Sequence, residues 1–127
     1  MTIDLQPCRD NFDRRVSAQQ AAREALRQQA RQAAIVAITQ TLPHYPTVTQ
    51  VYLFGSLTQP GQFHAHSDLD IAVAGTDAAT YFALWRDLEA ACPEWLIDLR
   101  EINQPSPFAS TVRQFGELVY EAPSRTA

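Results

Sequence analysis

Residues 54–70 read FGSLTQPGQFHAHSDLD, with a Gly-Ser pair after one apolar run and an Asp-x-Asp within the next. Successive side chains of a strand point to opposite faces, so Asp68 and Asp70 project together while Leu69 turns toward the core. Two carboxylates on one face repel each other and lose hydration unless a cation joins them. A hard divalent ion beside a phosphate substrate, such as Mg²⁺, would resolve this conflict. The stretch therefore predicts a nucleotide-binding, metal-dependent site.

The sequence around this stretch alternates between strand and helix patterns. Apolar runs predict strands over 48–54 and 69–74, and Thr76 is the candidate cap of the helix that follows. One apolar face of that helix ends at Cys92, which favours core packing. The rest of the pattern predicts a strand over 95–100, a short helix capped by Ser106 and closed by Gly116, and a last strand over 117–121.

The chain is long enough for one compact domain, because it has 127 residues of which 46% are hydrophobic. Residues 1–16 lack a periodic pattern and predict an irregular arm. Residues 17–122 predict the folded domain, which starts with a long helix that has a capping box at Ser17. Residues 123–127 predict a flexible tail. Mixed strands and helices in this order indicate the α+β class.

All ten Lys and Arg residues of the chain are arginines. The absence of lysine excludes a Walker A loop, a kinase-type lysine and Schiff-base chemistry. A net charge of −4 and a pI near 5.2 disfavour a general nucleic-acid partner. Arg23, Arg27 and Arg31 are spaced four apart on the predicted first helix. They form either a solvated face, which we favour, or a binding surface for an acidic partner or RNA.

Cysteine and histidine positions point to structure rather than to metal binding. Cys8 and Cys92 have no metal-ligand spacing, and a buried free thiol is expected at Cys92. His64 and His66 lie in a turn-rich loop, where loop histidines are favoured over a zinc site. The apolar runs are far shorter than the roughly 20 residues of a membrane span, so we expect no membrane partner and a cytoplasmic location.

Asp98 supplies a third carboxylate from the predicted strand over 95–100. Three carboxylates can hold two metal ions about 3.5 to 4 Å apart, which stabilises the attacking and leaving oxygens of a displacement at phosphorus. Asp98 would complete the second metal site and help to orient or deprotonate a nucleophilic hydroxyl. Gly55 lets the backbone approach phosphate closely, and Ser56 adds a hydroxyl donor in a short helical turn. Each motif alone has a plainer interpretation, but their combination favours a nucleotide site.

This order of motifs resembles the nucleotidyltransferase superfamily that includes DNA polymerase beta, and within it the minimal nucleotidyltransferase (MNT) domains. The resemblance covers roughly residues 48–121. It implies a two-layer nucleotidyltransferase fold, with a small mixed β-sheet backed by helices. It also assigns the nucleotide phosphates to Gly55 and Ser56, and catalysis and Mg²⁺ binding to Asp68, Asp70 and Asp98. This chain differs in a slightly longer spacer, in which residues 57–59 stand where relatives often carry an arginine; Arg100 is a candidate substitute.

MNT proteins that resemble this chain commonly act as antitoxins whose partner is a helical HEPN ribonuclease. The resemblance implies transfer of AMP from ATP to a tyrosine of that toxin, by attack of the phenolic oxygen on the α-phosphorus with pyrophosphate leaving. Two alternatives stay open: an impaired antitoxin that acts by binding alone, and a nucleotidyltransferase that acts on a small molecule or an RNA end. The acceptor would come from another protein or a second copy, so a homo- or hetero-oligomer is expected.

Overall fold

The computed structural model describes residues 3–123. In chain order its elements are α1 (Gln6–Thr41), the 3₁₀ turn η1 (Leu42–His44), β1 (Gln50–Leu53), the 3₁₀ turn η2 (Gly55–Thr58), β2 (Leu69–Ala74), α2 (Ala78–Ala91), β3 (Ile97–Glu101), α3 (Pro107–Phe115) and β4 (Glu117–Glu121). The predicted α+β class is confirmed, and every predicted strand is present with bounds that shift by a few residues at most.

The four strands form one mixed sheet in the order β3-β2-β1-β4. The central strand β1 runs antiparallel to both β2 and β4. Strands β2 and β3 are parallel, because α2 crosses back between them. The parallel pair places Asp70 directly beside Asp98 in the register. The candidate site therefore lies at the edge of the sheet that β3 forms.

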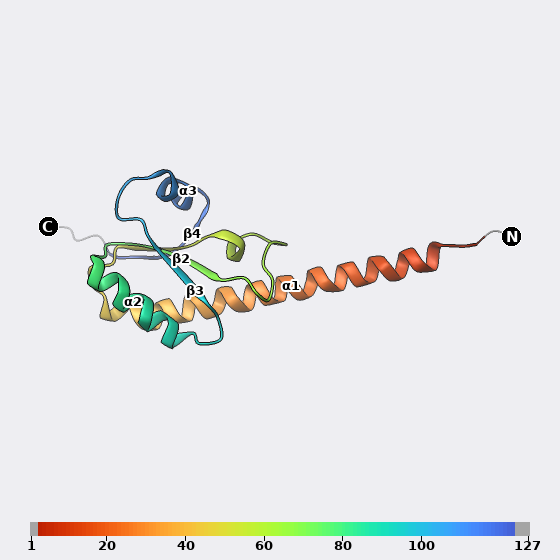
Figure 1. The fold of residues 1–127 in the computed structure, drawn as a ribbon, viewed down its shortest axis with the longest axis horizontal. Helices are drawn as coiled ribbons and strands as arrows, with labels where there is room; N and C mark the ends of the chain where they lie inside the picture. The colour runs from red at the N-terminus through yellow and green to blue at the C-terminus, as the bar shows by residue number, and fades with distance from the viewer. Residues whose placement is uncertain (1–2, 124–127) are drawn as a thin grey trace.

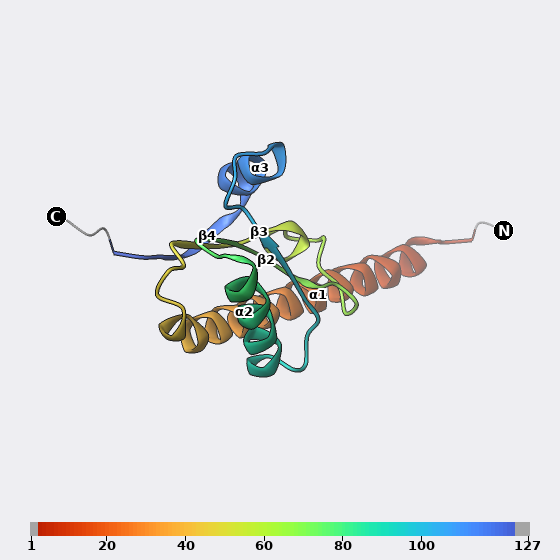
Figure 2. The same ribbon diagram turned by 60° about the vertical axis from the view of Figure 1, so that its left-hand side comes forward.

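Helices cover both faces of the sheet (Figure 1). Figure 2 shows α1 and α2 together on one side of the sheet and α3 on the other. The α1–α2 side holds the larger core, to which the strands contribute Val51, Leu53, Leu69, Ile71, Val73, Ile97 and Leu99. The α3 side holds a smaller cluster that includes Tyr52 and Ala72. Because side chains alternate along a strand, Asp70 and Asp98 belong to the α3 side, which one short helix covers only in part.

Helix α1 starts at Gln6, so the irregular arm expected for residues 1–16 is wrong from Gln6 onward, and only residues 3–5 of its described part are irregular. Pro7 stands in the first turn, where a missing N–H costs nothing. The backbone N–H of Gln6 donates to Asp4 Oδ1 at 3.0 Å, which serves one free donor of the helix start. The helix continues through Ser17, so the capping box expected there caps no helix end. Residues 1–2 lie outside the described part of the chain.

The two shorter helices have side-chain caps. Asp77, not the expected Thr76, caps α2 by accepting from the Thr80 N–H at 2.7 Å. Thr76 is held by Asn103, whose side-chain oxygen accepts the Thr76 N–H and whose amide donates to the Thr76 carbonyl. Thr76 and Asp77 could both cap a helix. Because Asn103 lies 27 positions from Thr76, the local sequence does not show which of the two is the cap. Ser106 caps α3 as predicted.

Three further expectations concern the surface and the chain end. Cys92 is a buried free thiol, as predicted, and Cys8 is exposed. Among the described residues no helix is both long and apolar enough to cross a membrane. The flexible tail expected over 123–127 lies outside the described residues beyond Pro123.

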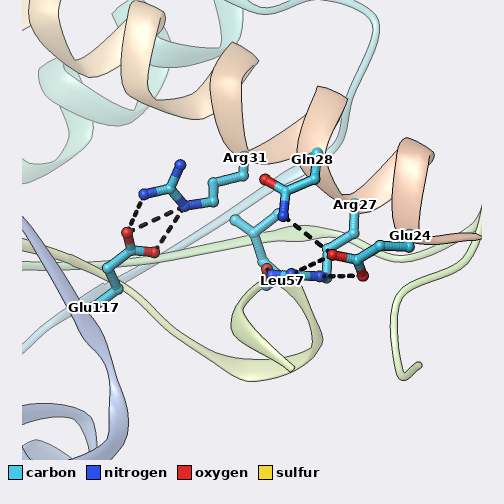
Figure 3. A network of polar contacts seen from close by, with 6 residues as sticks. All are labelled: Glu24, Arg27, Gln28, Arg31, Leu57 and Glu117. Atoms are coloured by element: carbon cyan, nitrogen blue, oxygen red, sulfur yellow. Dashed lines mark hydrogen bonds and ion pairs between the residues drawn. The ribbon is translucent and has the colours of Figure 1, made fainter. Parts of the chain in front are cut away.

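An ion pair ties α1 to β4 at the edge of the sheet (Figure 3). Arg31 Nε donates to both carboxylate oxygens of Glu117, at 2.9 and 3.1 Å, and Arg31 Nη2 also bonds to Glu117. The hydrogen bonds from Arg31 hold the pKa of Glu117 below its usual value near 4.5. The pair connects residues that are 86 positions apart, so it fastens the first helix to the last strand.

We expect Glu117→Gln to lower the free energy of unfolding by about 1 kcal/mol near neutral pH, since both side chains are about one-third exposed and water screens the pair. A carboxyl group with a lowered folded-state pKa contributes stability above its unfolded pKa and loses it as the pH falls through the folded pKa. The difference between wild type and variant should therefore shrink below about pH 4.5. Urea unfolding at neutral and acidic pH measures this, with Glu121→Gln on the same strand as control. A difference that persists in acid would contradict it.

Candidate active site

Two of the predicted acids come from neighbouring strands, and the third lies just before one of these strands. Asp70 and Asp98 are register partners on β2 and β3, and Asp68 lies exposed just before β2. Burial raises the pKa of Asp70 to about 6, and the charges of Asp98 and Asp68 add to the rise. The effect on Asp70 shows that all three carboxylates act on the same small region. Such a cluster favours a bound cation.

Asp98 is paired with an arginine of its own strand. Arg100 Nε donates to Asp98 Oδ1 at 3.1 Å, and Arg100 Nη2 donates to Asp98 Oδ2 at 3.3 Å. The Arg100 side chain is 59% exposed, so this pair is open to water. Its guanidinium offsets part of the negative charge beside Asp70. The guanidinium of Arg100 is therefore paired with Asp98, the third of the predicted acids.

The Gly-Ser turn touches the Asp-x-Asp strand directly. Gly55 has a φ of +68°, and a Cβ built there would lie 2.3 Å from Asp70 Oδ2. The Phe54 N–H also donates to the Asp70 carbonyl oxygen at 3.0 Å. Within the turn, Thr58 Oγ1 donates to the Gly55 carbonyl oxygen at 3.0 Å. Glycine is required at position 55 both by the backbone conformation and by the carboxylate beside it.

A small cavity lies beside the Gly55 turn, between η2 and α3. Its volume is about 190 Å³, and its lining includes Phe54, Phe108 and Phe115. The rings of Phe54 and Phe108 meet edge to face, with centroids 5.3 Å apart. An aromatic lining beside a turn of backbone amides gives room for an uncharged part of a ligand next to its charged part.

The carboxylates have the donor chemistry that a hard divalent ion prefers. As their side chains stand, no group of three or more His, Cys, Asp or Glu residues within 3–123 is arranged to hold a metal ion. In the candidate site, Asp98 is paired with Arg100. His64 and His66 lie exposed on the loop before β2, where the His66 N–H donates to His64 Nδ1 at 3.3 Å.

The solvated face expected for the three arginines of α1 is wrong for Arg27 and Arg31. Arg27 is 8% exposed, and its Nη1 donates to the Leu57 carbonyl oxygen at 3.1 Å. Arg31 is paired with Glu117, and Arg23 is the one of the three that is exposed. Figure 3 shows both arginines reaching from the helix toward the sheet side. The available signal was Glu24, because a carboxylate three residues before an arginine favours a fixed guanidinium.

Residues 37–125 match the family described as polymerase beta, nucleotidyltransferase. The chain belongs to this family and is a nucleotidyltransferase by class. No curated protein sequence matched the chain. The matched residues include the Gly-Ser turn and all three acids, whereas most of α1 lies before them.

Solved structures of toxin–antitoxin proteins are similar to this chain. A toxin–antitoxin structure with AMP-PNP is 28% identical, with a TM-score of 0.57 over 68% of this chain and 73% of that one. A variant of the toxin–antitoxin pair MntA–HpeT is 26% identical, with a TM-score of 0.56 over the same shares. The complex of the tri-AMPylated Shewanella oneidensis HEPN toxin with its MNT antitoxin is 25% identical, with a TM-score of 0.52 over 72% of each chain. The resemblance to MNT antitoxins is thereby confirmed.

Proposed function

We propose that this nucleotidyltransferase is the antitoxin of a HEPN/MNT pair and transfers AMP from ATP to a tyrosine hydroxyl of its HEPN-type partner. The contact between Gly55 and the Asp70 carboxylate carries the proposal, because it brings a phosphate-binding turn against a cluster of acids. A nucleotide bound at the turn would meet those acids through its phosphates. The similarity to a tri-AMPylated toxin complex supports AMP as the group transferred.

Each part of the site has a role in this reaction. The free N–H groups of the Gly55 turn and the Ser56 hydroxyl would bind the phosphates. Asp68, Asp70 and Asp98 would hold Mg²⁺, two ions in the full site, and the bound metal would offset negative charge on the phosphates. Asp98 would leave Arg100 and accept the proton of the phenol. The phenolic oxygen then bonds to the α-phosphorus as the bond to the bridging oxygen breaks, and pyrophosphate leaves.

A second function, neutralisation of the toxin by binding alone, is favoured by one observation. The ion pair between Arg100 and Asp98 occupies the third acid, and it would have to open before Asp98 could bind a metal. If it stays closed, the site lacks its third ligand. The protein would then neutralise the toxin only by binding to it.

One experiment separates the two functions. Wild type and the Asp68→Asn/Asp70→Asn variant are incubated with ATP labelled on the α-phosphate, Mg²⁺ and the HEPN-type partner, and both label transfer and ribonuclease activity are followed. The proposal predicts that wild type labels and inactivates the partner and that the variant does neither. Equal inactivation by both proteins without label would instead identify an antitoxin that acts by binding.

A further inference from the structure

A buried arginine of α1 reaches the candidate phosphate-binding turn from the side opposite the acids. We propose that Arg27 is a positioning residue, which holds the Gly55–Thr58 turn through the Leu57 carbonyl in the conformation that receives nucleotide phosphates. Its effect on phosphate binding rests on the function proposed above. Its effect on the conformation of the turn does not.

The contacts of Arg27 are those of a fixed side chain. Nη1 donates to the Leu57 carbonyl oxygen at 3.1 Å, while Nε and Nη2 donate to the two carboxylate oxygens of Glu24 at 2.9 and 2.6 Å (Figure 3). Gln28 also donates to Glu24, at 3.0 Å. Together Arg27 and Gln28 lower the pKa of Glu24 to about 2, so this carboxylate stays charged at neutral pH. A planar guanidinium held at two ends has little freedom to turn.

Arg27 acts on the turn and not directly on a phosphate. It is only 8% exposed, and its charge is already balanced by Glu24. A bound phosphate would have to displace that carboxylate and open the helix surface. The free energy of a buried charge is lowest when its partners stay in place, so Arg27 is suited to hold backbone.

The turn has an anchor at each end. Gly55 lies against the Asp70 carboxylate, and the Leu57 side chain is fully buried in the core under α1. Inside the turn, the Gln59 N–H donates to the Ser56 carbonyl oxygen at 3.1 Å. The bond from Arg27 to the Leu57 carbonyl fixes the peptide plane between Leu57 and Thr58. Without it, this end would be held by the Leu57 side chain and by hydrogen bonds within the turn alone.

This anchor comes from a part of the chain that the family match does not include. The match begins at residue 37, ten positions after Arg27. Residues 57–59, Leu-Thr-Gln, carry no charge of their own. The guanidinium that contacts this turn is therefore supplied by the preceding helix.

The test compares Arg27→Met with Arg31→Met as a matched control. Both variants remove an arginine from the same face of α1 and break one ion pair, but only Arg27 contacts the turn. We expect Arg27→Met to raise the KM for ATP about tenfold with a smaller change in kcat, because misplaced binding groups weaken phosphate binding first. Arg31→Met should lose some thermal stability, less than Arg27→Met because Arg31 is more exposed, and should keep the wild-type KM. Arg27→Lys, which retains a donor for Leu57, should recover part of the loss.

Amide hydrogen exchange without nucleotide gives the independent readout. Exchange at residues 56–59 should quicken in Arg27→Met and stay as in wild type in Arg31→Met. Unchanged exchange in Arg27→Met, or an equal rise in KM in both variants, would overturn the proposal. If even the wild type transfers no AMP, the proposed function fails, while the exchange data still decide whether Arg27 positions the turn.

Discussion

Asp70→Asn is expected to slow AMP transfer by a factor of about 100 to 1,000 while leaving the fold intact. Asp70 lies at the centre of the acid cluster, beside Asp98 and against Gly55. Asparagine keeps the shape of the side chain but cannot supply the negative charge that a divalent ion requires. Initial rates at saturating ATP, measured together with thermal unfolding, check both parts of the expectation.

The same substitution should keep or raise thermal stability in the metal-free protein. Burial and the neighbouring acids disfavour an ionised carboxylate at position 70, and a neutral amide removes that repulsion. Asp13→Asn, which removes an exposed carboxylate from α1, is the control for a change of net charge. Full activity of Asp70→Asn would exclude this residue from the reaction. A clear loss of stability would instead assign it a structural role.

Gly55→Ala should both destabilise the protein and abolish nucleotide transfer. The added methyl group would meet Asp70 Oδ2 at 2.3 Å, in a backbone conformation with φ +68° that alanine rarely adopts. We expect a loss of about 2 to 3 kcal/mol, composed of backbone strain and displacement of the carboxylate. Urea unfolding and initial transfer rates measure the two effects.

Gly61→Ala separates strain from contact. Gly61 also has a positive φ, +83°, but nothing lies within 4 Å of a Cβ built there. This variant should show a smaller loss, about 1 kcal/mol, and retain its activity. If the two variants lose the same stability and activity, the contact between Gly55 and Asp70 has no special importance.

The sheet and the placement of the acids could be predicted because they depend on local rules. Alternation along a strand puts Asp70 and Asp98 on the face opposite Ile71 and Leu99, whatever else the chain does. Ser106 followed by proline fixes the start of α3 in the same local way. These features follow from a few consecutive residues each.

The remaining features depend on contacts between distant residues. Arg27 and Leu57 are 30 positions apart, and neither segment of the sequence indicates the hydrogen bond between them. The early part of α1 has no regular apolar stripe, because it extends away from the sheet and packs against little (Figures 1 and 2). Helix prediction from sequence depends on hydrophobic periodicity, which this part of α1 lacks. The helix was therefore expected to start only at Ser17. The contact between Gly55 and Asp70 could not be predicted either. The motif gives the order of these residues in the sequence but not the distance between them in the fold.

AMP transfer is tested most directly by the intact mass of the HEPN-type partner after incubation with this protein, ATP and Mg²⁺, followed by peptide mapping. The mass of the partner should increase by whole AMP units, located on tyrosine, with release of pyrophosphate, and the increase should be lost with Asp70→Asn. An unmodified partner whose ribonuclease activity is nevertheless blocked would contradict it.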